Sequence, residues 1–178
     1  MERDLLLRKV ATALANDLSV PLGDLAARAG VGRTTLHRAF PTREILQRDV
    51  ARFAVAEVAR IYDRIGLDDD PVEAVLEKMG DEVLDLAVAF TLLWAEPPIT
   101  ALADLHAEAE TQDERFARFA ARGQAEGSFR KDVPDGWIGY SIGAQALALF
   151  YAVRSGFVGG RAVKRLFVTT VMGGVGVR

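Results

Sequence analysis

The chain of 178 residues is 50% hydrophobic and 26% charged, with a formal net charge of −3. A chain of this length and composition can bury one good core and a smaller one. It has no cysteine, which excludes a disulfide framework and a thiolate metal site.

The first predicted helix covers residues 3–15, where apolar side chains recur at helical spacing. These side chains are Leu5, Leu6, Val10, Ala13 and Leu14. Asn16-Asp17 follows as a turn, because Asn tolerates the left-handed conformation better than most residues. The first apolar run, residues 5–7, is short and is followed by Arg8-Lys9. We therefore expect no cleavable signal peptide, and a bacterial cytoplasmic location.

Two short helices joined by a glycine turn are predicted over residues 22–46. Gly30 stands where the chain must reverse, which needs a positive φ. Leu36 and Phe40, four residues apart, give the second helix its buried face. The face left outside is rich in hydrogen-bond donors: Arg33, Thr34, Thr35, His37 and Arg38. This arrangement predicts a helix-turn-helix whose second helix enters a major groove of DNA.

Basic residues cluster around the same segment. Residues 28–48 hold five arginines and one acid, Glu44. Residues 1–50 carry a net charge of +2, and residues 51–178 carry −5. A basic N-terminal module on an acidic body favours an anionic partner at one end, and arginine makes planar contacts to phosphate or guanine. Charge alone leaves open the alternative of a solvated helical face.

This segment resembles the TetR family of bacterial transcriptional repressors. The matching residues are Leu25-Ala26, Ala29-Gly30-Val31, Thr35-Leu36, Phe40-Pro41-Thr42-Arg43-Glu44 and Leu46. The chain departs from the family pattern at four positions in or beside this segment. Pro21 stands where the family often has Thr, and Thr34 where Gly is common. His37 stands where Tyr is usual, and Arg43 where Lys is usual. By this resemblance we expect His37 and Arg43 to hold phosphates. The residues expected to read base edges are Arg33, Thr34, Thr35 and Arg38.

A long helix is predicted to begin with Thr42 as its cap, to run to about Ile65 and to end at Gly66. A second apolar stripe then runs from Val72 to Phe90. The acidic run 68–70 between them could suggest a cation site. However, Asp70 as N-cap, Pro71 at the first helical position and Glu73 two residues later explain it as the start of a helix. We therefore expect no metal site.

Glu96-Pro97-Pro98 interrupts the helices, because two prolines cannot continue one. A short helix is predicted over residues 99–106 and a longer one over 108–126. The turn that follows, residues 127–134, contains a Gly-x-x-Arg-x-Asp-Val segment. This segment also resembles the TetR family, where it precedes the dimerisation helices.

Two segments near the end, residues 136–153 and 166–177, carry no charge. The first would span about 27 Å as a helix, which leaves a membrane-associated helical protein as an alternative. Small residues at four-residue spacing let helices approach closely. We expect a four-helix bundle between two subunits and no membrane contact, because a dimer also places two reading heads about 34 Å apart. The candidate interface residues are Gly139, Gly143, Leu147, Phe150, Leu166 and Thr170.

The family resemblance implies that residues 47–135 hold a pocket for a small-molecule effector. The candidate lining is mostly aromatic: Met79, Phe90, Trp94, Phe116, Phe119, Tyr140 and Gln145, with His106 as a further polar candidate. For any one of these residues, ordinary packing in a helix bundle is the simpler interpretation. A lining of this kind predicts an apolar or aromatic effector.

Catalytic patterns are weak in this sequence. His37 belongs to the helix-turn-helix, and His106-Ala-Glu108 lacks the further ligand that a zinc site would show. No glycine-rich loop follows a strand-like segment. We therefore expect neither an enzyme nor a bound cofactor.

Together these features predict an all-α protein with two domains. Residues 1–46 would form a three-helix, helix-turn-helix DNA-binding domain, and residues 47–178 a helical effector-binding and dimerisation domain. The predicted function is a homodimeric repressor that binds a palindromic operator and is released by a small apolar or aromatic effector. The alternative is a dimeric α-helical small-molecule-binding protein without specific DNA recognition, which Pro21, Thr34 and His37 leave open.

Overall fold

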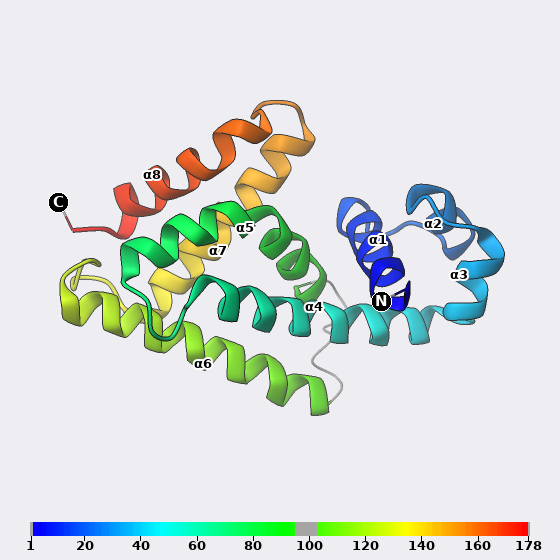
Figure 1. Ribbon diagram of the computed structural model, residues 1–178, viewed down its shortest axis with the longest axis horizontal. Coiled ribbons are helices and arrows are strands. Elements are labelled where there is room, and N and C mark those ends of the chain that lie inside the picture. The colour runs from blue at the N-terminus through cyan, green and yellow to red at the C-terminus, as the bar shows by residue number, and fades with distance from the viewer. Residues whose placement is uncertain (1, 95–102, 178) are drawn as a thin grey trace. The chain divides into compact units, whose positions relative to one another are not determined.

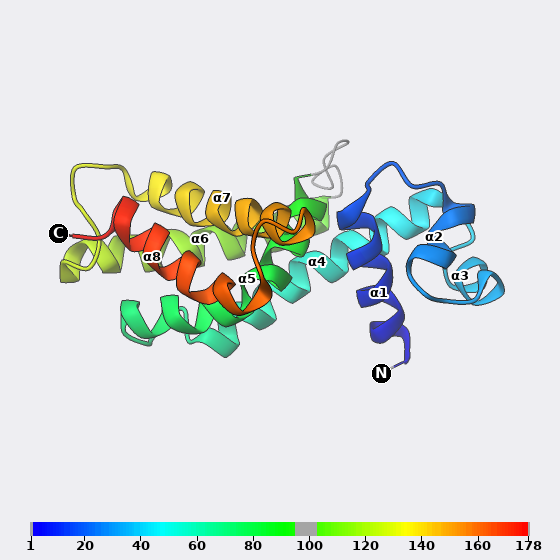
Figure 2. The ribbon, with the colours of Figure 1, turned by 90° about the horizontal axis from the view of Figure 1, so that it is seen from above.

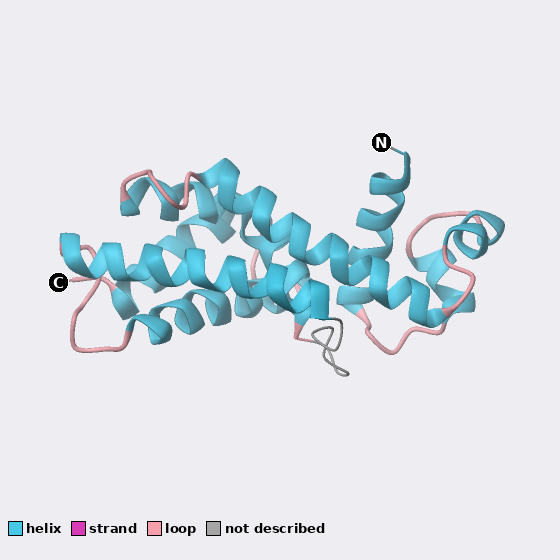
Figure 3. Ribbon diagram, turned by 90° about the horizontal axis from the view of Figure 1, so that it is seen from below, coloured by secondary structure: helices cyan, strands magenta, loops and turns pink. Residues whose placement is uncertain are grey.

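The computed structural model describes residues 2–94 and 103–177 (Figure 1). Figure 3 shows helices and loops in these residues and no named strand. The helices are α1 (Glu2–Asn16), α2 (Leu22–Arg28), α3 (Arg33–Ala39), α4 (Arg43–Ile65), α5 (Val72–Leu93), α6 (Ala103–Glu126), α7 (Asp135–Arg154), the short 3₁₀ helix η2 (Gly160–Ala162) and α8 (Val163–Val175). The predicted all-α fold is confirmed.

The chain divides into two compact units. The first consists of Met1–Glu57 and Val88–Glu108, and the second of Val58–Ala87 and Ala109–Arg178. Helices α4, α5 and α6 therefore each contribute residues to both units. The domain boundary predicted between residues 46 and 47 lies inside α4, near the start of this helix.

Charged side chains fasten α1 to α4 within the first unit. Arg3 Nη2 lies 2.7 Å from Asp49 Oδ2, and Arg8 Nη2 lies 2.9 Å from Glu57 Oε1. The Arg8 guanidinium also lies over the Phe53 ring, 5.7 Å from the ring centroid. Glu57 is only 2% exposed, and a buried carboxylate is tolerated only with a counter-charge and hydrogen bonds. These contacts therefore fix how α1 packs on α4.

Both ends of α4 follow the sequence prediction. The Thr42 hydroxyl oxygen accepts a hydrogen bond from the Ile45 backbone N–H at 3.3 Å, which caps the helix. Backbone and Thr42 hydrogen bonds lower the pKa of Glu44 in the first turn. At the other end Gly66 has a φ of +71°, a conformation that glycine adopts with little strain.

The starts of α5 and α6 differ from the prediction. The Pro71 carbonyl accepts the hydrogen bond of the Val75 N–H, so Pro71 takes the capping position predicted for Asp70. The Asp70 carboxylate instead accepts a bond from Lys78 Nζ at 2.6 Å. Helix α6 is continuous from Ala103 to Glu126, so the predicted break between residues 106 and 108 was wrong. No proline or glycine interrupts the chain there; the proline pair itself lies outside the described residues.

The core of the second unit contains a row of aromatic rings. Tyr62 of α4 contacts Phe116 of α6, Phe116 contacts Phe119, and Phe119 contacts Phe129, with ring centroids 5.6–5.8 Å apart. Phe129 lies against Gly123, where a Cβ atom would come within 2.3 Å of the ring. Burial raises the pKa of the Tyr62 hydroxyl well above its usual range. These contacts join α4, α6 and the turn after α6.

Helices α7 and α8 lie side by side in the second unit (Figures 1 and 2). The end of α8 returns to the turn after α6, where the Arg130 N–H donates to the Val175 carbonyl at 2.9 Å. The Val177 N–H donates to the Ser128 carbonyl at 3.1 Å. The final described residues are therefore held by backbone pairing to the segment that precedes α7.

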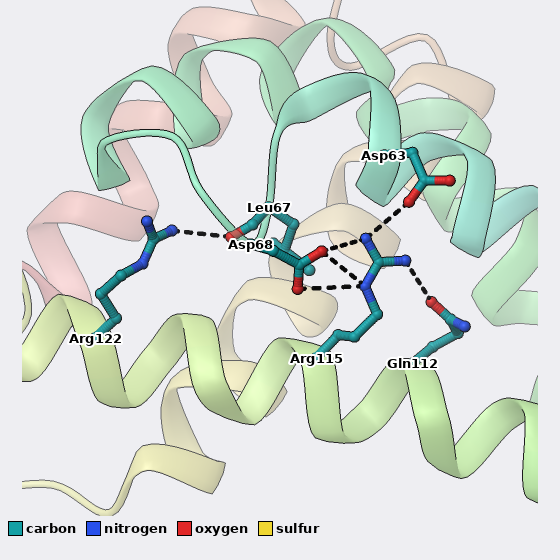
Figure 4. Close-up of polar contacts among 6 residues, drawn as sticks. All are labelled: Asp63, Leu67, Asp68, Gln112, Arg115 and Arg122. Carbon is teal, nitrogen blue, oxygen red and sulfur yellow. Dashed lines mark hydrogen bonds and ion pairs between the residues drawn. The ribbon is translucent and has the colours of Figure 1, made fainter.

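Arg115 of α6 binds the end of α4 and the turn that follows it (Figure 4). Its Nη2 donates to Asp63 Oδ1 at 2.8 Å, and its Nε donates to Asp68 Oδ2 at 3.0 Å. Its Nη1 donates to Gln112 Oε1 at 3.1 Å. The guanidinium also lies 5.8 Å from the centroid of the Tyr62 ring. One largely buried side chain thus holds two carboxylates at the junction of α4 and α5.

Arg122, seven residues further along the same helix, completes this contact. Its Nη2 donates to the Leu67 carbonyl at 2.9 Å (Figure 4). Its guanidinium lies 5.7 Å from the centroid of Phe119. We call Arg115 and Arg122 together the α6 clamp.

Replacement of Arg115 by Ala is expected to lower the free energy of unfolding by about 2 kcal/mol, because it removes charged hydrogen bonds at a largely buried position. For a chain of this length that is a fall in Tm of roughly 4–8 °C. Thermal unfolding followed by circular dichroism at one protein concentration measures it. Arg118→Ala is the matched control, since Arg118 is exposed and lies 3.9 Å from its partner Glu114. Equal Tm values for the two variants would contradict the role given to the α6 clamp.

The contribution of Arg115 is expected to depend on pH. Hydrogen bonds from Arg115 lower the pKa of Asp68, so this carboxylate stabilises the fold above its unfolded pKa. That stabilisation is lost as the pH falls through the lowered pKa of the folded state. The Tm difference between wild type and Arg115→Ala should therefore be full at pH 7 and shrink below about pH 4. A difference that stays constant between pH 7 and pH 3 would rule out a role for the Asp68 charge.

Candidate functional site

The predicted helix-turn-helix is confirmed in the first unit (Figure 1). Gly30 ends the turn after α2 with a φ of +63°. The Val31 N–H reaches back to the Ala26 carbonyl at 2.9 Å, which closes the end of α2. Leu25, Leu36 and Phe40 are almost completely buried. The short helix α3 is therefore held from behind by apolar packing, and its polar side faces outward.

The outward face of α3 consists of exposed side chains with hydrogen-bond donors: Arg33, Thr34, Thr35, His37 and Arg38. Among the described residues, none of these side chains forms a hydrogen bond or an ion pair within the chain. Arg48 on α4 is exposed and uncommitted in the same way. Their donors are therefore available to phosphates or base edges.

Arg28 and Arg43 differ from these arginines. Arg28 Nη1 lies 2.7 Å from Asp17 Oδ2. Hydrogen bonds from Ser19 and the Arg28 partner lower the pKa of Asp17. Arg43 is half-buried and donates to two backbone carbonyls of the loop between α1 and α2, those of Leu18 and Val20. Both arginines therefore already have partners inside the chain.

The residues predicted to line an effector pocket fall into both units. Phe90 and Trp94 belong to the first unit and stack with ring centroids 5.8 Å apart. Met79 and Phe119 are buried in the second unit, where Phe116 and Gln145 are half-buried. Trp94 is 55% exposed and Tyr140 is 70% exposed, so neither side chain lies in the core of a single chain. His106 is exposed as well.

Some of the residues predicted for a dimer interface reach the surface of the single chain, and others are buried inside it. Leu147 and Leu166 are half-buried and Thr170 is exposed, so these three reach the surface of the single chain. Gly143 and Phe150 are buried within it. Gly139 is half-buried, and a Cβ atom there would lie 3.4 Å from Phe116. The close approach at this glycine is therefore to α6 of the same chain.

A different side of α7 is exposed and apolar. It carries Trp137, Tyr140, Ala144, Ala148 and Tyr151. Their spacing of three, four, four and three residues places them on one face of the helix. Sequence reasoning missed Trp137 and Tyr151 here, because helical spacing groups them on one face but does not show whether that face turns inward. We call these five residues the α7 outer face.

Helix α7 is also long and apolar enough to cross a membrane by length and composition, with a mean hydropathy of 1.2. A third of the 18-residue window is buried against the rest of the chain. Its inward side packs through Ile138, Ile142 and Ala146. A helix that packs on one side and is apolar on the other fits a protein interface as well as a lipid surface.

Two of the acidic residues considered for a cation site are bound by basic side chains. Among the described residues, no group of three or more His, Asp or Glu side chains could hold a metal ion. Asp68 belongs to the acidic run that could suggest a cation site, and its carboxylate is bound by Arg115. Its neighbour Asp70 is bound by Lys78.

Comparison with known proteins identifies similar regulators, although no family model matches the chain. The chain is 33% identical over 143 residues to the HTH-type transcriptional repressor LfrR of Mycolicibacterium smegmatis, across 80% of this chain and 74% of that protein. The crystal structure of the TetR-like transcriptional regulator LfrR from Mycobacterium smegmatis in complex with proflavine is similar at a TM-score of 0.73 and 28% identity, over 99% of this chain and 97% of that one.

A more distant structure shows the same fold. The ketosteroid transcriptional regulator KstR2 of Mycobacterium tuberculosis matches with a TM-score of 0.65 at 16% identity, over 100% of this chain and 96% of that one. The relatives are transcriptional regulators rather than enzymes. Together with the glycine turn and the uncommitted donors on α3, these similarities show that the chain belongs to the TetR family of transcriptional regulators, with a DNA-binding helix-turn-helix at its N-terminal end.

Proposed function

We propose that this protein is a cytoplasmic repressor that binds a two-fold symmetric operator as a homodimer and is released by a small aromatic effector. The observation that carries the proposal is the outward face of α3, whose donors are exposed and uncommitted among the described residues. Five donor-bearing side chains on one face of a short helix suit contacts with phosphates and base edges. Similarity to a repressor over four fifths of the chain supports the same function.

DNA recognition would divide between base edges and phosphates. Arg33, Thr34, Thr35 and Arg38 would read base edges from α3, with the arginines suited to the two acceptors of guanine. His37 would donate to a phosphate oxygen, a contact that fixes register and carries no sequence information. One short helix reads only a few base pairs, so specificity requires two such helices in a dimer.

Dimerisation would use the α7 outer face. Aromatic side chains such as Trp137, Tyr140 and Tyr151 are enriched in the buried centres of protein interfaces, and each has a polar atom that tolerates exposure before assembly. The alanines between them, Ala144 and Ala148, let two helices approach closely. Leu166 and Thr170 on α8 would extend the same surface. Gly143 and Phe150 would contribute indirectly, by packing α7 inside its own chain.

The effector is proposed to be apolar and aromatic. In the second unit, Phe116 and Phe119 lie between Tyr62 and Phe129 in edge and tilted contacts, so a flat ligand that entered beside these rings would meet aromatic faces and edges. Met79 adds an adaptable apolar contact, and Gln145 is a half-buried group able to orient a polar substituent. The similar regulator LfrR has been crystallised in complex with proflavine, which supports a ligand of this class.

The test of the function is selection of genomic DNA fragments by the purified protein, followed by anisotropy titrations at two salt concentrations with competitor DNA. Retention of a few fragments that share a two-fold symmetric sequence supports the proposal. Weak binding to all fragments that vanishes at higher salt would instead favour a helical small-molecule-binding protein without specific DNA recognition.

Arg38→Ala is expected to weaken operator binding by at least tenfold, and binding to a random duplex by clearly less, because base-edge contacts carry the discrimination. Anisotropy titrations of both duplexes at one salt concentration measure the two losses. Arg118→Ala removes an exposed arginine of α6 and serves as the control for net charge. Equal losses on the two duplexes would show that Arg38 contributes only electrostatic attraction.

Tyr140→Glu is expected to convert the dimer to a monomer at micromolar concentration, because a carboxylate would be buried in the interface without a partner. Sedimentation velocity measures the oligomeric state. Leu5→Glu is the matched control, since Leu5 is an exposed apolar residue of α1, outside the α7 outer face. A Tyr140→Glu variant that remains dimeric would place the interface elsewhere.

A further inference from the structure

We propose that Arg43 is a positioning residue that sets the loop before α2, and that it does not hold a DNA phosphate. This proposal rests on the proposed DNA-binding function and revises one role within it. The residue opens α4, at a position where the family resemblance implies a phosphate contact. In this chain its side chain points to backbone groups instead.

The geometry at Arg43 is that of a two-pronged internal contact. Its Nη1 donates to the Val20 carbonyl at 2.6 Å, and its Nη2 donates to the Leu18 carbonyl at 2.9 Å. Among the described residues, no other group donates to either carbonyl. The side chain is half-buried, so turning it outward to DNA would leave two acceptors without their donors. Leaving such groups unpaired is unfavourable wherever water cannot replace the donor.

The loop that Arg43 holds determines where α2 begins. Pro21 precedes α2 and offers no side-chain cap to it. The other side-chain hydrogen bonds of the loop, among the described residues, involve Asp17, whose carboxylate accepts from the Ser19 N–H and hydroxyl and from Arg28. Asp17 therefore organises the first half of the loop, and Arg43 organises the second half. Because α2 packs against α3, Arg43 links the start of α4 to the position of the recognition helix.

Arginine is required for this contact by its shape. The guanidinium presents two nitrogens side by side, which suits two carbonyls that are two residues apart along the loop. A lysine ammonium is a compact charge on a flexible stem; it binds phosphate well but cannot reproduce the fork. Replacement of Arg43 by Lys therefore separates the two roles, because it keeps the charge and removes the geometry.

The experiment compares Arg43→Lys and Arg43→Ala with wild type, and uses Arg48→Ala as the matched control. Arg48 lies on the same helix, is exposed, and forms no side-chain bond among the described residues. The first measurement is amide hydrogen exchange of residues 17–25 in the free protein. The second is the slope of log K against log salt for a random-sequence 30-base-pair duplex. Circular dichroism establishes that each variant is folded.

We expect both Arg43 variants to exchange at least tenfold faster in residues 17–25, whereas Arg48→Ala matches wild type. The salt slope of Arg43→Ala should stay within about 0.3 of wild type, because no phosphate contact is lost. Wild-type exchange in Arg43→Lys, or a slope that falls by about 0.9 in Arg43→Ala, would overturn the proposal. Should wild-type protein bind no DNA, the proposed function fails while the exchange measurement still decides the role of Arg43.

Discussion

The fold depends on charged side chains that fix α4 along its length. Arg43, its first residue, holds the loop before α2, and Asp49 and Glu57 bind arginines of α1. In the second unit, Asp63 in its last turn is bound by Arg115 of α6. Each contact joins α4 to a neighbour within one unit. Helix α4 is one continuous helix that contributes residues to both units. In each unit, the arginine contacts fix which residues of α4 lie against its neighbours.

The arginines discussed above fall into two groups. One group forms hydrogen bonds within the chain, and the other has no such partner among the described residues. Arg8, Arg43 and Arg115 are bound by carboxylates or carbonyls of the chain, and the bonds are worth most where water is excluded. Arg33 and Arg38 on α3 have no such partner among the described residues, and we propose that their donors bind DNA. We therefore expect substitutions in the first group to affect folding and substitutions in the second group to affect DNA recognition. The distinction also explains why net charge alone is a poor guide to the binding surface.

The aromatic residues also fall into two groups, one in the core of the second unit and one on the surface of α7. The row from Tyr62 to Phe129 builds the interior of the second unit, where the proposed effector would bind. Trp137, Tyr140 and Tyr151 lie outside, on a helix whose other side is packed. We propose that a second subunit covers this exposed aromatic face. We propose ligand binding for the first set and assembly for the second.

The sequence by itself determined most of the helices and the recognition motif, because local signals suffice for these, although it predicted a break near residue 107 where α6 is continuous. Gly30 and Gly66 mark turns that need positive φ, Thr42 caps α4, and the spacing of Leu36 and Phe40 leaves the donors of α3 outside. It did not determine the partners of Arg43 and Arg115, which lie 23 to 52 residues away along the chain. It also assigned Tyr140 to the pocket and Phe150 to the interface, while the fold exposes the first and buries the second. Only tertiary packing decides which side of α7 turns inward, because its residues 136–153 carry no charge and apolar side chains lie on both its packed and its exposed face.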